Sequence, residues 1–459
     1  MIRRLRIRTL LLVLWLALLA MACNLSGTQA PPTISPRATE TPPPTLGYST
    51  LSPAELPQEA STLVANVDFG LANLTNEIES DRLMLHIDSL VGFGTRHVNS
   101  GYNRSDWGIG AAGTYIQQQF QRIQDDTRGR LVVFPQPFEV TWAGIDSQAY
   151  NVVAFLSGTE PGYGTVVIGA HYDSISQDVE DGQALAPGAN DNATGVAALI
   201  ELARVLSTRN HRASIMFIAF SAEEVNRQGS RAFVENYLLP RDIDINMMIN
   251  LDILGSPMDS RGNIDDLNIR IFSEGPDDSP SRAAARAIEL IGLNHIPDMG
   301  IDIQTTGDRE GRYSDHLSFS EAGYPSIRLI QSLENQARQN SSSDTIDQIQ
   351  AAYLTRVTRS ILTIVTALAD GLAPPQNIAL RDNGNGIRTL VWEPIPGASG
   401  YIIALRRPNA LNYEQFEWNE GETSVTWDGF VPERFVGLAI AAKDANGLMG
   451  PLSPEFPIR

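Results

Sequence analysis

The chain has 459 residues, of which 42% are hydrophobic, so it is long enough for two or three domains that each bury a core. Its formal net charge of −19 argues against a nucleic-acid partner, because phosphate binding needs basic patches and the sequence contains none that we can identify. The single cysteine excludes an intramolecular disulfide bond, so packing and bound metal must stabilise the fold.

The N-terminus has the pattern of a secretory signal peptide. Arginines at positions 3, 4, 6 and 8 precede an uninterrupted apolar run from Leu10 to Ala22. The run is shorter than the roughly 20 residues that a helix needs to cross a bilayer, so we expect export rather than a permanent membrane span. Residues 1–22 are therefore predicted to be the signal peptide.

The only cysteine, Cys23, follows Ala20-Met21-Ala22, and this segment resembles the lipobox of bacterial lipoproteins. The resemblance implies that Cys23 is acylated and becomes the new N-terminus, which would anchor the protein to a membrane at the cell surface. A lipobox usually has leucine or another branched residue where this chain has Ala20. Ordinary cleavage after Ala22 and release of the protein is therefore the alternative.

The segment from Asn24 to about Leu56 is rich in proline and threonine and lacks apolar periodicity. Such a composition is typical of a tether, and in polyproline form it could reach on the order of 100 Å from a membrane. We therefore predict an acylated cysteine and a tether over residues 23–58.

Regular structure is predicted after Pro57, with helices and strands that alternate. Apolar residues at helical spacing predict helices, and runs of Val, Ile and Phe predict strands. The predicted helices are 83–90, 110–123, 195–206, 230–237 and 283–291, and the predicted strands are 131–134, 151–156, 165–170, 214–220, 247–251 and 326–329. This alternation indicates an α/β sheet with helices on both faces, and strands that are apolar throughout are typical of buried parallel strands.

Acidic and imidazole side chains recur along this region in short apolar or glycine-rich frames: His171, Asp191, Glu223, Glu224, Asp252 and His316. His171, the adjacent glutamates and Asp252 follow the ends of predicted strands, where open α/β sheets form their sites. Two histidines and three carboxylates can hold two zinc ions about 3.5 to 4 Å apart, and a fourth carboxylate remains to take a proton from water. The order therefore predicts a two-metal hydrolase site.

Five segments in this order resemble the motifs of the M28 family of zinc peptidases, the bacterial leucyl-type aminopeptidases and their relatives: His171-Tyr172-Asp173-Ser174, Gly188-Ala189-Asn190-Asp191-Asn192, Ser221-Ala222-Glu223-Glu224, Asn250-Leu251-Asp252 and Ser314-Asp315-His316. Together they are specific, although each alone would be weak. The resemblance covers roughly residues 60–370. It implies a mixed, mostly parallel sheet of about eight strands that is flanked by helices.

The resemblance also implies a division of labour at a site with two zinc ions: one ion on His171 and Asp252, the other on Glu224 and His316, with Asp191 between them. Glu223 would be the general base. The carboxylate of Asp173 would accept the second imidazole N–H of His171 and fix the tautomer of that ring. The implied enzyme is a peptidase that removes N-terminal amino acids from peptide substrates.

Single residues of this set also have plainer interpretations. Taken singly, an aspartate before a helix is more often a cap, and paired glutamates after a strand are more often a solvated start to a helix. Neither explains the full set. A carboxypeptidase or dipeptidase of the same family, and a glutaminyl cyclase of the same fold with one zinc ion, remain alternatives. A receptor-like member without activity would lack ligands that are all present here.

The segment from Pro374 to Arg459 changes character, because turn residues separate short β-like runs near positions 388, 401, 424 and 436. This pattern predicts a small all-β sandwich. Trp392, Tyr401 and the final Asp444-Ala445-Asn446-Gly447 resemble a fibronectin type III module, which would act as a spacer or contact cell wall, glycan or peptide. We therefore expect a peptidase domain over residues 59–373 and a β-sandwich over residues 374–459.

Overall fold

The structure, a computed structural model, describes residues 69–305, 308, 312–418 and 422–459. The chain divides into two units, residues 1–41 and 42–459, and all that follows concerns the second. The predicted signal peptide, Cys23 and the tether lie outside the described residues. Within the described ranges, no helix combines the length and the apolar character that a membrane crossing requires.

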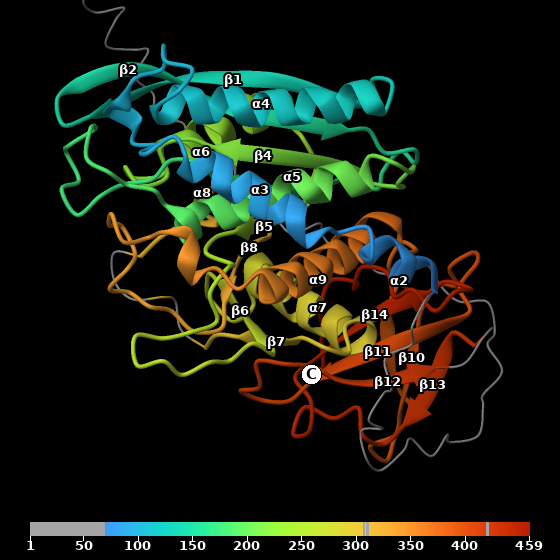
Figure 1. Ribbon diagram of the computed structural model, residues 1–459. Helices are drawn as coiled ribbons and strands as arrows, with labels where there is room; N and C mark the ends of the chain where they lie inside the picture. The colour runs from blue at the N-terminus through green and yellow to red at the C-terminus, as the bar shows by residue number, and fades with distance from the viewer. Residues whose placement is uncertain (1–68, 306–307, 309–311, 419–421) are drawn as a thin grey trace, which may run out of the picture. The chain divides into compact units, whose positions relative to one another are not determined.

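An eight-stranded mixed sheet forms the centre of the fold (Figure 1). In order across the sheet, the strands are β1 (Leu131–Trp142), β2 (Ile145–Leu156), β4 (Ser214–Phe220), β3 (Thr165–His171), β5 (Ile245–Leu251), β8 (Ser326–Gln331), β6 (Asn268–Ser273) and β7 (Gly300–Ile303). The strands β4, β3, β5 and β8 run parallel to one another, as do β6 and β7. The predicted fold class, a mixed and mostly parallel sheet, is confirmed.

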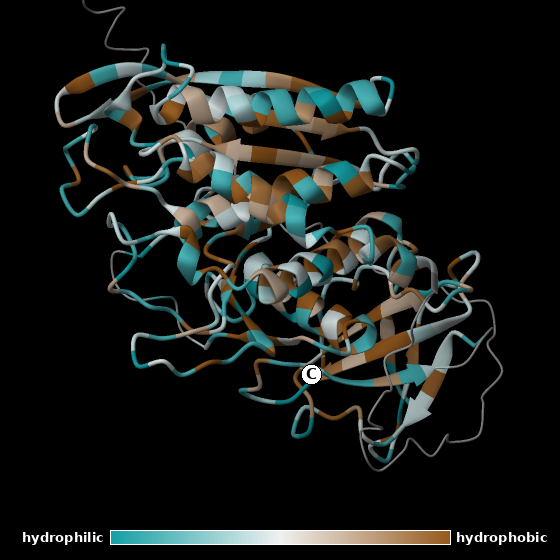
Figure 2. Cartoon of the chain, viewed as in Figure 1, coloured by the Kyte–Doolittle hydropathy of each residue, from teal (hydrophilic) through white to brown (hydrophobic). Residues whose placement is uncertain are grey.

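The two faces of the sheet bury different side chains. Because alternate residues of a strand point to opposite faces, Val166 and Ile168 join one apolar cluster while Val167 joins another with Phe233 and Phe319. The first cluster contains helices α3 (Ser80–Val91), α4 (Gly108–Asp126), α5 (Thr194–Leu206), α7 (Pro280–His295) and α9 (Ala351–Asp370), and the second contains α6 (Gln228–Phe233) and α8 (His316–Glu321). Helices therefore cover both faces, as predicted, and Figure 2 shows the apolar residues along β4.

The edge of the sheet departs from the prediction. Only residues 131–134 of β1 were predicted as a strand, yet β1 pairs with β2 over its full length around a two-residue turn at Ala143 and Gly144, both with positive φ. Pro135 and Pro137 disfavour a strand in general, but they are tolerated here because β1 is the outermost strand and needs a partner on one side only.

The C-terminal segment forms two antiparallel sheets. One contains β13 (Ser424–Trp427), β10 (Arg388–Val391) and β9 (Ala379–Asp382); the other contains β12 (Glu414–Trp418), β11 (Gly400–Arg406), β14 (Gly437–Lys443) and β15 (Phe456–Pro457). Four of these strands coincide with the predicted runs. Tyr401 and Ile403 of β11 face the interior of the sandwich, whereas Ile402 and Ala404 belong to the apolar cluster of the large sheet and its helices. Both faces of β11 are therefore buried.

Candidate metal centre

Three neighbouring parallel strands end at one edge of the sheet and present the predicted donors there. His171 is the last residue of β3 and pairs with Phe220, the last residue of β4. Glu223 and Glu224 follow β4 after two residues, and Asp252 directly follows β5. The ladder that aligns the strands therefore also aligns these side chains, as the sequence predicts.

Asp191 reaches the same place from an irregular loop. The loop starts at Gly188, which has left-handed backbone angles, and Asp191 itself is not helical although α5 begins three residues later. The side chain of Asn192 ties the loop to β5, because its Nδ2 donates to the carbonyl of Leu251 and its Oδ1 accepts from the N–H of Ile253. Asp191 is thus held over the strand ends.

The donor atoms form two overlapping groups around His171. Its Nε2 lies 3.3 Å from Oδ1 of Asp191 and 3.4 Å from Oδ1 of Asp252. Donor atoms of His171, Asp191 and Asp252 lie within 4.8 Å of one another, and the same is true of His171, Glu223 and Glu224. Five of the six predicted side chains are therefore brought together.

His316 belongs to neither group among the described residues. It begins α8, is buried, and its Nε2 lies 3.6 Å from Oε1 of Glu274. Its Nδ1 makes no hydrogen bond within the described part of the chain. The structure thus places the predicted fifth ligand next to the site but facing a different carboxylate.

Asp173 contacts the site through both its backbone carbonyl and its carboxylate. The Nδ1 of His171 lies 3.2 Å from the backbone carbonyl oxygen of Asp173, whereas the carboxylate Oδ1 is 3.6 Å away. The carboxylate instead accepts hydrogen bonds of 3.0 Å from the backbone N–H groups of Glu223 and Glu224. The carbonyl therefore fixes the tautomer of His171, and the carboxylate holds the glutamate pair. Support of the His171 imidazole by the carboxylate stays a prediction, since Oδ1 of Asp173 lies 3.6 Å from the same Nδ1.

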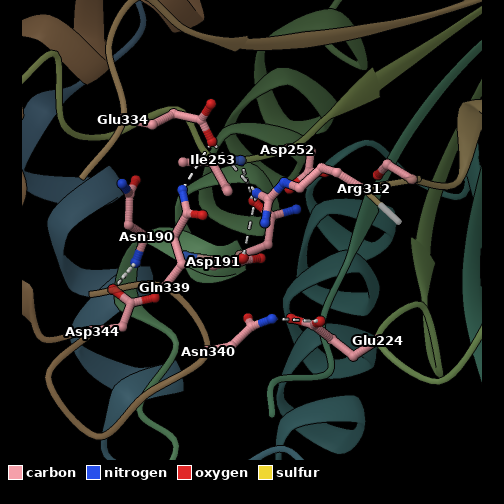
Figure 3. A network of polar contacts seen from close by, with 12 residues as sticks. Asn190, Asp191, Glu224, Asp252, Ile253, Arg312, Glu334, Gln339, Asn340 and Asp344 are labelled. Carbon is pink, nitrogen blue, oxygen red and sulfur yellow. Dashed lines mark hydrogen bonds and ion pairs between the residues drawn. The ribbon is translucent and has the colours of Figure 1, made fainter. Parts of the chain in front are cut away.

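The carboxylate of Asp344 holds the loop that carries Asp191 in the same way, and Asp344 was not predicted as a site residue. Its two carboxylate oxygens accept from the backbone N–H groups of Asn190 and Asp191, each at 2.9 Å (Figure 3). Asp344 is 2% exposed, and it follows three serines in a polar segment without apolar periodicity. No sequence signal separates it from an ordinary loop aspartate.

Two arginines at the site were also missed. Arg328 of β8 is fully buried, with its Nε 2.9 Å from Oδ2 of Asp252. Arg312 lies further out, with its Nη2 3.8 Å from Oδ2 of Asp191 and 3.7 Å from Oε1 of Glu334 (Figure 3). The sequence did contain a signal for Arg328, because this charged residue stands between Ile327 and Leu329 in a predicted strand, and a buried charge must be paired.

Negative charge is concentrated around His171. Burial raises the pKa of Glu224 well above its usual value, and Asp191 and Glu223 raise it further. Burial also raises the pKa of Glu223, with Asp315 and Asp252 adding to the effect. At Asp252 burial acts in the same direction, but Arg328 and His171 outweigh it and hold the pKa well below the usual range. Positive charge at this place would therefore be stabilised.

Zinc fits this donor set. One imidazole nitrogen and several carboxylate oxygens are the ligands that zinc takes in catalytic sites. Oε1 of Glu224 and Oδ1 of Asp252 are buried and make no hydrogen bond within the described residues. Buried polar atoms normally have partners, so these two oxygens are suited to a metal ion.

The comparisons with known proteins agree with this chemistry. The model of peptidase family M28 matches residues 151–365. A probable zinc metalloprotease of Leptosphaeria maculans is 32% identical over 364 residues, which are 72% of this chain and 84% of that protein. A probable zinc metalloprotease of Pyricularia oryzae is 32% identical over 467 residues, which are 91% of this chain and 88% of that protein. The family match includes every predicted metal donor.

Solved structures share the fold. The LapA aminopeptidase of Legionella pneumophila superimposes with a TM-score of 0.54 at 20% identity, over 66% of this chain and 75% of that one. The aminopeptidase of Aneurinibacillus sp. strain AM-1 does so with a TM-score of 0.50 at 16% identity, over 65% of this chain and 96% of that one. The large sheet and its helices are thus an aminopeptidase-like fold.

Proposed function

Since the chain belongs to peptidase family M28 and is a zinc metallopeptidase, we propose that it removes amino acids from the N-termini of peptides. The observation that carries the proposal is the pair of donor groups around His171. We assign one carboxylate of the Glu223-Glu224 pair to a metal ion and the other to the reacting water. The choice of the N-terminal end is supported by the aminopeptidases that share the fold.

We assign His171 and Asp252 to one zinc ion, Glu224 to a second, and Asp191 to both. The distances from His171 Nε2 to Asp191 and Asp252, 3.3 and 3.4 Å, support the assignments of these three residues. Zinc at such a site supplies a Lewis acid that polarises the scissile carbonyl and lowers the pKa of water toward neutrality. His316 stays the predicted fifth ligand, at the second ion, because its Nδ1 is buried and makes no hydrogen bond with any described residue, whereas its Nε2 faces Glu274.

Glu223 is the side chain that we assign to proton transfer. Its carboxylate takes a proton from the attacking water as the oxygen adds to the carbonyl carbon, and it gives that proton to the amine nitrogen as the carbon–nitrogen bond breaks. Glu223 is 8% exposed, and its backbone N–H is held by the carboxylate of Asp173. The surrounding chain therefore fixes the position of the base.

The experiment that tests the proposal uses purified full-length protein loaded with zinc. Peptides with a free N-terminus, an acetylated N-terminus or an N-terminal Gln are incubated separately, and the products are identified by mass. We expect release of the first residue from free N-termini alone. Cleavage of acetylated peptides would show a carboxypeptidase or another peptidase, and loss of ammonia from Gln would show a cyclase.

We further propose that the protein is exported and anchored through a lipid on Cys23, as its lipobox-like segment suggests. The test compares the chain with a Cys23→Ala variant, expressed in a bacterium fed with labelled palmitate. Label on the parent chain and none on the variant is expected. An unlabelled parent chain found in the medium would support cleavage after Ala22 instead.

For residues 374–459 we propose a fibronectin type III-like module that is fixed to the peptidase domain. The buried second face of β11 and the hydrogen bond from Arg286 Nε to the carbonyl of Leu411, at 2.8 Å, support the fixed attachment. Contact of this module with cell wall or glycan stays a prediction. Deletion at residue 373 should therefore expose apolar surface and lower the solubility of the peptidase domain.

A further inference from the structure

Arg96 is a fully buried arginine in the loop between α3 and a short helical turn at Val98–Ser100. We propose that Arg96 is a positioning residue of the metal centre, whose guanidinium joins the turn after His171 to the loop that carries Asp191 and so fixes the spacing of the metal donors. The inference rests on the proposed assignment of His171 and Asp191 to metal, and it adds the residue that holds their two segments together.

The guanidinium of Arg96 donates to backbone carbonyl oxygens of both segments. Its Nε donates at 2.6 Å to the carbonyl of Tyr172, the residue directly after His171. Its Nη2 donates at 2.9 Å to the carbonyl of Gly188, and its Nη1 donates to the carbonyl of Pro187. Because one planar group serves oxygens of both segments, the segments cannot separate without breaking these bonds.

The backbone around Arg96 pairs with the same two segments. The N–H of Arg96 donates to Oγ of Ser174 at 3.0 Å, and its carbonyl accepts from the N–H of Ser174 at 3.3 Å. Oγ of Ser174 in turn donates to the carbonyl of Ala186 at 2.7 Å, and the N–H of Ala186 donates to the carbonyl of Gly94 at 3.0 Å. Ser174 is therefore a second link between the segments.

Groups of opposite charge hold the Asp191 loop at its two kinds of polar backbone group. Arg96 donates to two consecutive carbonyl oxygens at the start of the loop. Asp344 accepts from the N–H groups of Asn190 and Asp191. The contact with Arg96 also leaves no space for a side chain at Gly188, where a Cβ would lie 2.6 Å from Nη2. The orientation of the loop backbone is therefore determined by both partners.

The shape of the Arg96 side chain matters as well as its charge. Burial lowers the pKa of Arg96 to about 10, although the charges of Asp344, Asp173 and Asp191 oppose this effect, so the guanidinium is charged at neutral pH. A lysine would keep the charge, but its single ammonium group cannot reproduce the fixed fork of Nε, Nη1 and Nη2. Arg96→Lys therefore separates the geometry of the fork from the charge.

The experiment compares the thermal unfolding of metal-free and zinc-saturated full-length protein, and chelator competition measures the zinc affinity. The variants are Arg96→Lys and Ser174→Ala, with circular dichroism to verify folding. Arg286→Lys is the matched control, because Arg286 is 1% exposed and donates to the carbonyl of Leu411 in the C-terminal module. A purely structural change lowers both unfolding temperatures alike. A positioning change also reduces the rise that zinc causes, since that rise depends on zinc affinity.

We expect Arg96→Lys to lower zinc affinity by about 10-fold to 100-fold and to reduce the zinc-induced rise in unfolding temperature. Ser174→Ala should act in the same direction by a smaller factor. Arg286→Lys should lower both unfolding temperatures and leave zinc affinity unchanged.

Parent-like zinc affinity in Arg96→Lys, or in Ser174→Ala if Arg96→Lys does not fold, would overturn the inference. Equal losses of zinc affinity in Arg96→Lys and Arg286→Lys would also overturn it, because Arg96 would then support only the fold. An Asp191→Asn variant that binds zinc as the parent does would reject the assignment of Asp191 to metal and the inference with it. The expected zinc affinities without release of N-terminal residues would reject the proposed activity alone.

Discussion

The two sides of the metal centre are built in different ways. On one side, His171 and Asp252 stand at the ends of adjacent parallel strands and are 1% and 3% exposed. On the other, Glu224 and its hydrogen-bond donor Asn340 lie on loops and are only partly buried. The sheet ladder fixes the first pair, whereas hydrogen bonds from loop to loop fix the second. A rigid scaffold thus determines half of the site, and the other half depends on a few polar contacts.

Two buried carboxylates provide those contacts in the same manner. Asp173 accepts from the backbone of Glu223 and Glu224 at 3.0 Å, and Asp344 accepts from the backbone of Asn190 and Asp191 at 2.9 Å. Each holds two consecutive N–H groups with its two oxygens. The loop side should therefore be sensitive to changes that neutralise a supporting carboxylate, even where no donor is altered.

The largest effect is expected from Glu223→Gln, which spares the donors on both sides. The amide cannot accept a proton, so turnover should fall by roughly 10² to 10⁴ while zinc content is retained. Release of the first amino acid is measured together with metal content by mass spectrometry. Glu139→Gln, the same change at an exposed position, is the control. Near-normal turnover in Glu223→Gln would reject Glu223 as the base.

Asp344→Asn tests the loop side through the proposed bridging ligand. The amide offers one acceptor oxygen for two backbone N–H groups, so the loop that carries Asp191 should loosen. Because Asp191 is assigned to both ions, both zinc affinities should fall, by about 10-fold to 100-fold. Equilibrium dialysis against a graded chelator measures this, with the exposed Asp126→Asn as control. An effect on one ion alone would argue against a bridging Asp191.

Asp173→Asn should distinguish the two sides, because its carboxylate holds Glu224 but neither Asp191 nor Asp252. We expect the affinity for the zinc ion assigned to Glu224 to fall about 10-fold or more, and the affinity for the ion assigned to Asp252 to change less. The same dialysis measures both. Equal losses at both steps would mean that the carboxylate of Asp173 acts on His171 after all.

The smallest effect concerns the stability of the fold, at a residue outside the metal centre. Burial raises the pKa of Glu289 on α7 to about 7, with Asp302 adding to the rise and a hydrogen bond from Asn412 opposing it. Since the folded chain holds this proton more tightly than the unfolded chain, the protonated form is favoured in the folded state. The contribution of Glu289 to the free energy of unfolding is therefore fully present below about pH 4.5, and it is lost as the pH rises through about 7.

Glu289→Gln should remove this part of the pH dependence. We expect the variant to be more stable than the parent by about 1 to 3 kcal/mol at pH 8 and nearly equal to it at pH 4.5, with unchanged zinc binding. Thermal unfolding at the two pH values measures the difference. A constant difference at both values would show that Glu289 ionises as an exposed glutamate does.

The strand side of the site was predictable and the loop side was not, for a physical reason. The apolar composition of segments such as 165–170 and 214–220 predicts buried strands. The residue that follows such a strand must lie at the edge of the sheet. Asn340 and Asp344 flank three serines, a composition that is typical of any loop. Their positions follow from long-range hydrogen bonds, which leave no local pattern.

The same distinction applies to the fold. The central strands were predicted nearly to the residue, whereas most of β1 was missed because its prolines are acceptable only at an edge, and edge position is a property of the whole sheet. The strands β6 and β7 were not predicted at all. Strand β6 has the charged Arg270 in its middle. This side chain forms an ion pair at 2.9 Å with Glu334, a residue that is distant in the sequence.

The most direct test of a centre with two metal positions is a calorimetric titration of Zn²⁺ into the metal-free, full-length protein. We predict that two zinc ions bind per chain, because the donors form two groups around His171. A stoichiometry of a single ion at saturating zinc would contradict the account.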